Sequence, residues 1–177
     1  INTPNSFGAI SIDSNNDIIV STDDTTNYLP SAGTNISLLE ANYDKDMADY
    51  SSLFTGVQAD LEAGTVTSTG KTDTVINIED LKGTDQVDTL RGNADDNTLY
   101  GGNSNDTLIG LDGVDYLDGE LGNDLADYSD ATTPGVGVII DLSDTDGNNV
   151  ANDGFGNIET VANIQNIIGT NQDDFIN

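Results

Sequence analysis

A glycine recurs every nine residues in the middle of this 177-residue chain, and that spacing constrains the fold more than any other feature. Five nonapeptides follow one another without a break over residues 83–127: GTDQVDTLR, GNADDNTLY, GGNSNDTLI, GLDGVDYLD and GELGNDLAD. A partial sixth copy occupies residues 169–177. Self-similarity at a short fixed period predicts a repeat architecture, in which each repeat packs on its neighbours.

Two positions of the nonapeptide keep the same chemical character from copy to copy. The sixth position is acidic or an amide, and it holds Asp88, Asn97, Asp106, Asp115 and Asp124. The eighth position is apolar, and it holds Leu90, Leu99, Leu108, Leu117 and Ala126. We expect the first six residues of each copy to turn and the last three to form a short strand whose apolar side chain points inward. Two copies then make one coil of a solenoid.

Stacked coils bring the sixth-position carboxylates of copies two apart to within about 4.8 Å of each other. Two bare carboxylates at that distance repel by roughly 3.5 kcal/mol at an effective dielectric of about 20, and a calcium ion between them reverses the sign. We therefore expect at least three Ca²⁺ sites, between the turns at 83 and 101, 92 and 110, and 101 and 119. The predicted ligands of this run are Asp85, Asp88, Asn97, Gly101, Asn103, Asp106, Gly110, Asp112, Asp115, Gly119 and Asp124. Asn97 is uncharged, so its site is expected to be weaker.

The charge of the chain favours calcium and excludes several other chemistries. The chain has 4 Lys and Arg against 32 Asp and Glu, a net charge of -28, and neither His nor Cys. Disulfides, zinc or haem sites that need those ligands, Ser-His-Asp triads and Cys nucleophiles are thus excluded. An acidic chain with few aromatics can also be disordered, but here the apolar residues are periodic, which favours a fold that depends on calcium. A metal-free solenoid would have to offset stacked acidic turns with a very small core.

Nucleic acid and membranes are not expected partners. The four cationic residues are scattered, so no basic patch is available for phosphate groups. No stretch approaches the roughly 20 apolar residues that cross a bilayer.

A second duplication frames the nonapeptides. The sequence ADYS at residues 48–51 recurs at residues 126–129, and NIEDLKGTDQVDTL from Asn77 matches NIQNIIGTNQDDFI from Asn163. Residues 46–92 and 124–177 thus look like two copies of one β-rich unit. Such units can cap the open strand edges of the roll or carry a ligand surface, and both readings stay open.

We divide the chain into an N-terminal β segment, residues 1–45, which packs on or caps the solenoid, and a solenoid unit, residues 46–177. One acidic loop of the solenoid unit predicts a further calcium ligand set. Asp144 and Asp146 alternate in DTDGN, which includes a turn glycine, and the competing interpretation is a solvated type I turn.

The nonapeptides resemble those of the RTX (repeats-in-toxin) family, closely over residues 83–127 and weakly over residues 169–177. The resemblance implies an all-β fold, a parallel β-roll or β-solenoid with bound calcium, extended here by irregular β-rich flanking units. It also implies export by type I secretion, folding in extracellular calcium, and a location outside the cell or on the bacterial cell surface.

Two functions follow from the resemblance. The first is a calcium-dependent extracellular module of a bacterial RTX adhesin that binds a peptide or carboxylate ligand and so mediates attachment, with a cell-surface peptide, protein or glycan as its partner. The alternative is a non-catalytic C-terminal module that drives calcium-triggered folding after type I secretion of a toxin or hydrolase. In either case we expect a monomeric module of a larger chain.

Two other functions are disfavoured. Carboxylate pairs such as Asp49 and Asp60 could support glycosidase chemistry, but calcium explains them more simply, so no enzyme activity is expected. Ice binding would need a flat, regular threonine array, and only Thr89, Thr98 and Thr107 are in register.

Overall fold

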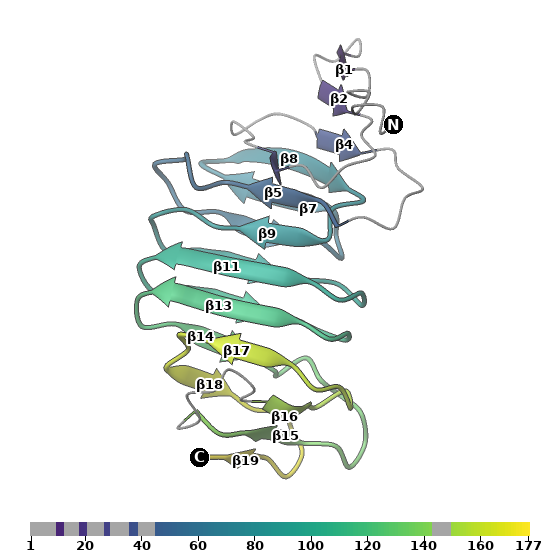
Figure 1. The fold of residues 1–177 in the computed structure, drawn as a ribbon, viewed down its shortest axis with the longest axis vertical. Coiled ribbons are helices and arrows are strands. Elements are labelled where there is room, and N and C mark those ends of the chain that lie inside the picture. Colours follow the sequence, from purple (N-terminus) through teal and green to yellow (C-terminus); the bar gives the residue numbers. More distant parts are fainter. Residues whose placement is uncertain (1–9, 13–17, 21–26, 29–35, 39–44, 143–149) are drawn as a thin grey trace, which may run out of the picture.

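The computed structural model describes residues 10–12, 18–20, 27–28, 36–38, 45–142 and 150–177, and it confirms the predicted all-β class. Every regular element in these ranges is a β-strand. The strands stack like rungs along one long axis, with β1 near one end and β19 at the other (Figure 1). No helix in this part of the chain is long and apolar enough to cross a membrane.

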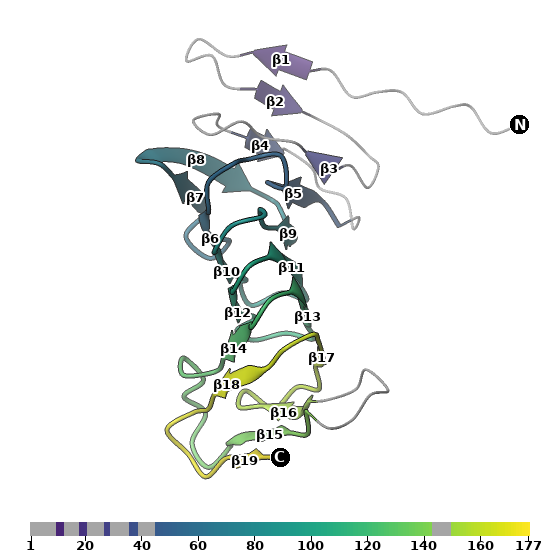
Figure 2. The ribbon, with the colours of Figure 1, turned by 90° about the vertical axis from the view of Figure 1, so that its left-hand side faces the viewer.

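Two mainly parallel sheets form the sides of the roll and face each other (Figure 2). One side contains, in order, β6 (Gln58–Asp60), β10 (Thr89–Arg91), β12 (Thr107–Ile109), β14 (Leu125–Asp127) and β18 (Asn166–Ile168). The other contains β5 (Met47–Asp49), β9 (Asp80–Lys82), β11 (Thr98–Asn103), β13 (Tyr116–Leu121) and β17 (Thr160–Ala162). Successive nonapeptides alternate between the sheets, so two copies make one coil, as predicted.

The remaining strands extend both ends of the roll. At the N-terminal end, the first sheet continues through β7 (Thr65–Ser68), β8 (Lys71–Ile76), β4 (Ile36–Leu38), β2 (Ile18–Val20) and β1 (Ile10–Ile12), and β3 (Asn27–Tyr28) pairs with β5. At the C-terminal end, a third sheet has the order β16 (Val150–Asp153), β15 (Val138–Ile140) and β19 (Phe175–Ile176). The N-terminal strands thus pair with the sheets of the solenoid unit, and the domain boundary at residue 45 stays a prediction.

The core of the roll is two columns of side chains, one from each sheet. Because parallel pairing sets Leu90 opposite Leu108 and Leu99 opposite Leu117, equivalent positions stack directly. All five eighth-position side chains are 0% exposed, as the repeat predicts. Each buried leucine contributes about 1.5–3 kcal/mol relative to an exposed one. A core only one side chain wide per strand leaves much of the stability to the turns.

Each of the two flanking units makes an equivalent backbone hydrogen bond, as their matching sequences predict. The N–H of Tyr50 donates to the carbonyl of Lys82 at 2.8 Å, and the N–H of Tyr128 donates to the carbonyl of Ile168 at 2.9 Å. Both tyrosine rings are buried and belong to the core. The duplication is therefore structural as well as sequential.

The turns impose one backbone shape on residues that do not favour it. Gly102 occupies the second position of its nonapeptide with a φ of 115°, in the left-handed region that glycine tolerates. Leu111 and Glu120 occupy the same position with φ values of 78° and 59°. Such a conformation costs an L-residue roughly 1–2 kcal/mol. The stacked turns therefore override local preference.

Candidate calcium sites

The sixth-position side chains form a hydrogen-bonded ladder along one edge of the roll. Oδ1 of Asp106 accepts a hydrogen bond from the N–H of Asp88 at 2.8 Å, and Oδ1 of Asp124 accepts one from the N–H of Asp106 at 2.8 Å. At one end the N–H of Val57 donates to Asp88 at 2.6 Å, and at the other the N–H of Asp124 donates to Oε1 of Gln165 at 2.7 Å. Each side chain thus ties its own turn to the turn one coil away.

The opposite edge has a similar ladder through Asn97. The N–H of Asn97 donates to Oδ1 of Asp115 at 2.8 Å, and its side-chain amide donates to the carbonyl of Glu79 at 2.7 Å. Oδ1 of Asn97 accepts from the N–H of Asn93 at 2.8 Å. The amide oxygen of Asn97 is therefore already engaged within its own turn, which gives a physical reason for the predicted weakness of this site.

The second carboxylate oxygen of several ladder residues is buried without a donor. No N–H or O–H group among the described residues donates to Oδ2 of Asp106, Asp115 or Asp124, or to Oε1 of Glu159. All four side chains are at most 2% exposed. Leaving a buried polar atom unpaired costs about 1–3 kcal/mol, and more for a charged group. These oxygens fit a bound cation.

An oxygen-lined space lies beside each first-position glycine, and we call it the glycine cradle. A methyl group placed on Gly101 would lie 2.6 Å from Oδ2 of Asp106 and 2.9 Å from the carbonyl oxygen of Gly119. One placed on Gly83 would lie 2.5 Å from Oδ2 of Asp88 and 2.3 Å from the carbonyl oxygen of Gly101. Carboxylate and carbonyl oxygens are the ligands that calcium prefers, and only glycine leaves this space free.

Three cradles lie between the same pairs of turns as the three predicted sites, whose occupation by calcium stays a prediction, and two more cradles are present. At Gly92 the lining oxygens belong to Asn97 and Gly110, so the predicted pairing of the turns at 92 and 110 is present. The additional cradles lie beside Gly119 and Gly110, where the next coil contributes the carbonyl oxygen of Asn163 and a carboxylate oxygen of Glu159, respectively. No three acidic side chains in the described ranges cluster closely enough to hold a metal alone, so backbone carbonyls must complete each shell.

Sequence reasoning missed Glu159, although a signal was present. Residues 154–162, GFGNIETVA, have glycine at the first place and Val161 at the eighth, and glutamate replaces aspartate at the sixth. Val161 pairs with Leu117 and is fully buried, like an eighth-position residue of the run. The segment therefore fills the place of a further nonapeptide.

Thr84 is a second residue that sequence reasoning missed. Its N–H donates to Oδ2 of Asp88 at 2.6 Å, and its hydroxyl lies 3.1 Å from the same oxygen. In the partial copy, the hydroxyl of Thr170 donates to Oδ1 of Asp174 at 2.8 Å. A threonine at the second position thus satisfies the carboxylate of its own turn, so Asp88 needs a cation less than Asp106 or Asp124 does.

The third-position residues lie at the tips of the turns. Asp85, Asn103 and Asp112 are exposed, and the side-chain amide of Asn103 donates to Oδ1 of Asp85 at 2.6 Å. These side chains join neighbouring coils at the surface, and their role as calcium ligands stays a prediction. Residues 143–149 lie outside the described residues, so the predicted ligands Asp144 and Asp146 are not placed.

Burial raises the pKa of the ladder carboxylates. It raises the pKa of Asp106 to about 7, and the charges of Asp88 and Asp124 act in the same direction. Burial likewise raises the pKa of Asp115 to about 6 and that of Glu159, which also faces the charge of Asp115, to about 9. In the absence of a cation, protons are the remaining means of neutralising these groups.

Comparison with known proteins agrees with this geometry. A family model described as "RTX calcium-binding nonapeptide repeat (4 copies)" matches residues 82–117 and, overlapping, residues 91–126. No curated protein matches the chain significantly. The family match includes the glycine cradles of the run and ends before the segment that contains Glu159.

The raised pKa values predict that acid partly replaces calcium. A folded-state pKa above the unfolded value near 3.8 gives stability that is present below that value and is lost as the pH rises through the folded pKa, here about 6 to 7 for Asp115 and Asp106. Without calcium, far-ultraviolet circular dichroism should therefore show more β structure at about pH 5 than at about pH 7.5, and calcium should remove most of the difference. A calcium-free chain that gains β structure as the pH rises would contradict this assignment.

Replacing one ladder carboxylate should weaken calcium-dependent folding. Asp106→Asn keeps an oxygen for the N–H of Asp88 but removes the charge from the cradle, so the calcium concentration at half-folding should rise about tenfold, or about 1.4 kcal/mol. Asp96→Asn is the matched control, since the exposed Asp96 also accepts a backbone hydrogen bond, from Val114 at 2.8 Å. Calcium titrations followed by circular dichroism measure the calcium concentration at half-folding of both variants. Equal shifts in that concentration would refute the assignment of Asp106 as a calcium ligand.

Proposed function

Because residues 82–126 are RTX calcium-binding nonapeptide repeats, we propose that this chain is a calcium-triggered folding module that works outside the cell. The observation that carries the proposal is the set of buried carboxylate oxygens that receive no hydrogen bond, at Asp106, Asp115 and Asp124. These groups oppose folding where calcium is scarce. They become ligands where calcium is abundant, so one chain has two states.

The free energy of calcium binding is large enough to switch the chain from unfolded to folded. An ion at a concentration of about 100 times its dissociation constant stabilises the folded state by about 2.7 kcal/mol. Three such ions contribute about 8 kcal/mol, which is comparable with the entire stability of a typical domain, about 5–15 kcal/mol. The narrow leucine core supplies little surplus to fold the acidic chain without them. Calcium therefore decides between the folded and unfolded states.

Export in the unfolded state fits this behaviour. A chain that stays unfolded inside the cell can pass through a type I secretion channel and fold when it meets extracellular calcium. Calcium sites of extracellular modules have dissociation constants of about 10⁻⁴–10⁻³ M, which suits such a trigger. In this role the module is non-catalytic and acts as a folding element of a longer secreted protein.

Folding should depend on calcium specifically. In chelator, we expect little β structure and a radius of gyration near the value of about 45 Å for an unfolded chain of this length. Calcium should produce the β signal and a much smaller radius in X-ray scattering. Magnesium should not replace it, because magnesium requires a tighter octahedral shell and keeps its waters. Equal β content and equal radius in chelator and in calcium would rule out the proposal.

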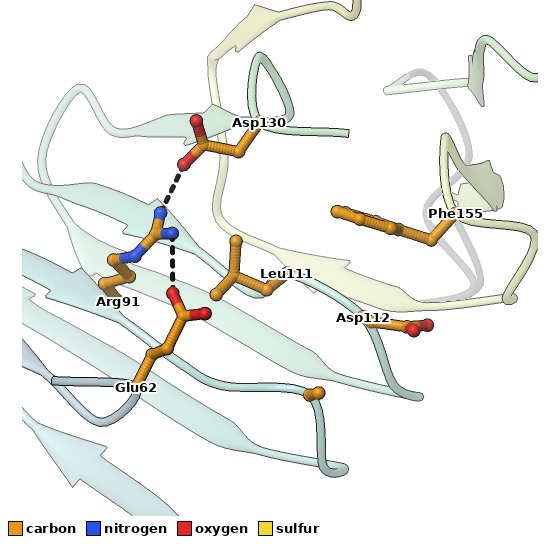
Figure 3. A pocket seen from close by; sticks show the side chains of 7 residues that line it. Glu62, Arg91, Leu111, Asp112, Asp130 and Phe155 are labelled. Carbon is orange, nitrogen blue, oxygen red and sulfur yellow. Dashed lines mark hydrogen bonds and ion pairs between the residues drawn. The ribbon is translucent and has the colours of Figure 1, made fainter. Parts of the chain in front are cut away.

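A second candidate function, ligand binding by an RTX adhesin, is supported by one hollow on the surface. Seven residues line a hollow of about 340 Å³: Glu62, Arg91, Ala94, Leu111, Asp112, Asp130 and Phe155. The Arg91 guanidinium pairs with Glu62 at 3.0 Å and with Asp130, and the Phe155 ring points toward the hollow from the other side (Figure 3).

The charges of this hollow favour a glycan over a peptide carboxylate. Three carboxylates and one guanidinium line the hollow, so an additional ligand carboxylate would meet net repulsion. Sugar hydroxyls can instead bond to the carboxylates and the guanidinium, while a sugar ring packs on the phenyl face. The attachment function would then use a cell-surface glycan.

Glycan binding can be tested with a matched pair of phenylalanine variants. Phe155→Ala should abolish binding on a glycan array in calcium, since it removes the only aromatic ring among the described residues that line the hollow. Phe54→Ala is the control, because Phe54 is 94% exposed and does not line the hollow. Absence of any bound glycan, or an equal loss in the control, would remove this candidate.

A further inference from the structure

The C-terminal unit places a glutamate on the ladder of sixth-position side chains. Tyr116 of β13 pairs in parallel with Thr160 of β17, so Glu159 lies opposite Asp115. The glutamate belongs to the segment 154–162, which lies outside the residues that the family model matches. The register of the sheet, and not the repeat sequence, brings the two carboxylates together.

Several hydrogen bonds hold the turn that leads to Glu159. Asp153 is fully buried, and its Oδ1 accepts hydrogen bonds of 2.8–2.9 Å from the N–H groups of Phe155, Gly156 and Asn157. The side chain of Asn157 donates to Oδ1 of Asp112 at 2.8 Å, which fixes the turn to the nonapeptide turn above it. The position of Glu159 is therefore set from both sides.

The two carboxylates converge on one cradle. Glu159 is 1% exposed and Asp115 is 2% exposed. A methyl group on Gly110 would lie 2.3 Å from Oδ2 of Asp115 and 3.1 Å from Oε1 of Glu159. No N–H group or hydroxyl of the described residues donates to either oxygen, and the two carboxyl groups lie close enough to share a proton when no cation is bound. Two buried carboxylates thus point their unpaired oxygens at the same space.

The other oxygen of each carboxylate already accepts a hydrogen bond. The N–H of Asn97 donates to Oδ1 of Asp115, and the hydroxyl of Tyr128 donates to Oε2 of Glu159 at 2.9 Å. Donors to a carboxylate favour its ionised form. When both carboxyl groups are ionised at one buried point, a cation between them relieves their repulsion, and an all-oxygen set selects a hard cation.

We propose that Asp115 and Glu159 bind an additional calcium ion that joins the C-terminal unit to the nonapeptide roll. This inference rests on the proposed calcium-dependent folding. The ion differs from those of the run because, beside Gly110, the next coil supplies a carboxylate in place of a glycine carbonyl. Its loss would release the C-terminal unit and leave the nonapeptides folded.

The other edge of the roll offers a natural comparison. There, the sixth place of the next coil holds Gln165, whose neutral amide oxygen accepts the hydrogen bond from the N–H of Asp124. Glu159→Gln gives the first edge the same residue type at this place. The substitution keeps an acceptor for the hydroxyl of Tyr128 and removes only the charge.

The experiment compares calcium uptake in Glu159→Gln and in the control Glu62→Gln, which removes the same charge from an exposed side chain. Native mass spectrometry should count one ion fewer in Glu159→Gln and no change in the control. Hydrogen exchange in calcium should show faster exchange over residues 150–168 of Glu159→Gln, with residues 83–109 still protected.

If Glu159→Gln fails to fold, a second measurement tests the proposed ion. Terbium takes the oxygen ligands of calcium, and emission excited through tyrosine reports a nearby ring. Tyr128→Phe should lower this emission more than Tyr100→Phe, because the hydroxyl of Tyr128 contacts a proposed ligand. An unchanged ion count in Glu159→Gln, or equal emission from the two tyrosine variants, overturns the inference and leaves calcium-dependent folding intact. If the wild-type chain takes up no calcium, the proposed function fails as well.

Discussion

The sixth-position carboxylate, buried in a turn, is the interaction on which the rest of this structure depends. One oxygen of Asp106 accepts a hydrogen bond from the N–H of Asp88 and so fixes how one coil stacks on the next. The other oxygen faces the cradle beside Gly101 and receives no hydrogen bond. The group that aligns the coils is thus also the group that opposes their stacking until a cation arrives. The register of the coils and the proposed calcium dependence thus have one cause.

This dependence explains features that look costly in isolation. The net charge of -28 would destabilise a compact domain by self-repulsion, and ions bound beside the ladder carboxylates would offset part of it. Leu111 and Glu120 adopt a left-handed backbone, which costs free energy that the stacked turns must offset. The narrow leucine columns suffice because they need only position the strands. Each feature is unfavourable without calcium and acceptable with it.

The sequence predicted what the repeat itself encodes. The leucine column, the ladder at Asp88, Asp106 and Asp124, and the alternation between two sheets all follow from a period of nine. The unbroken run of nonapeptides ends before Glu159 and Gln165, so sheet register was needed to show that both residues continue the ladder, although the segment 154–162 carries a weak repeat signal. It also could not show that Thr84 satisfies Asp88 or that third-position side chains pair at the tips, since those contacts depend on side-chain direction.

The central claim is that calcium occupies the glycine cradles between stacked carboxylates. Anomalous diffraction from a crystal grown in calcium, measured at a wavelength where calcium scatters anomalously, locates the ions directly. The account predicts peaks beside Gly101 and Gly119, within bonding distance of Oδ2 of Asp106 and Asp124. An ordered roll with no peak in these cradles, or with ions only at the exposed tips near Asp85 and Asp112, would contradict it.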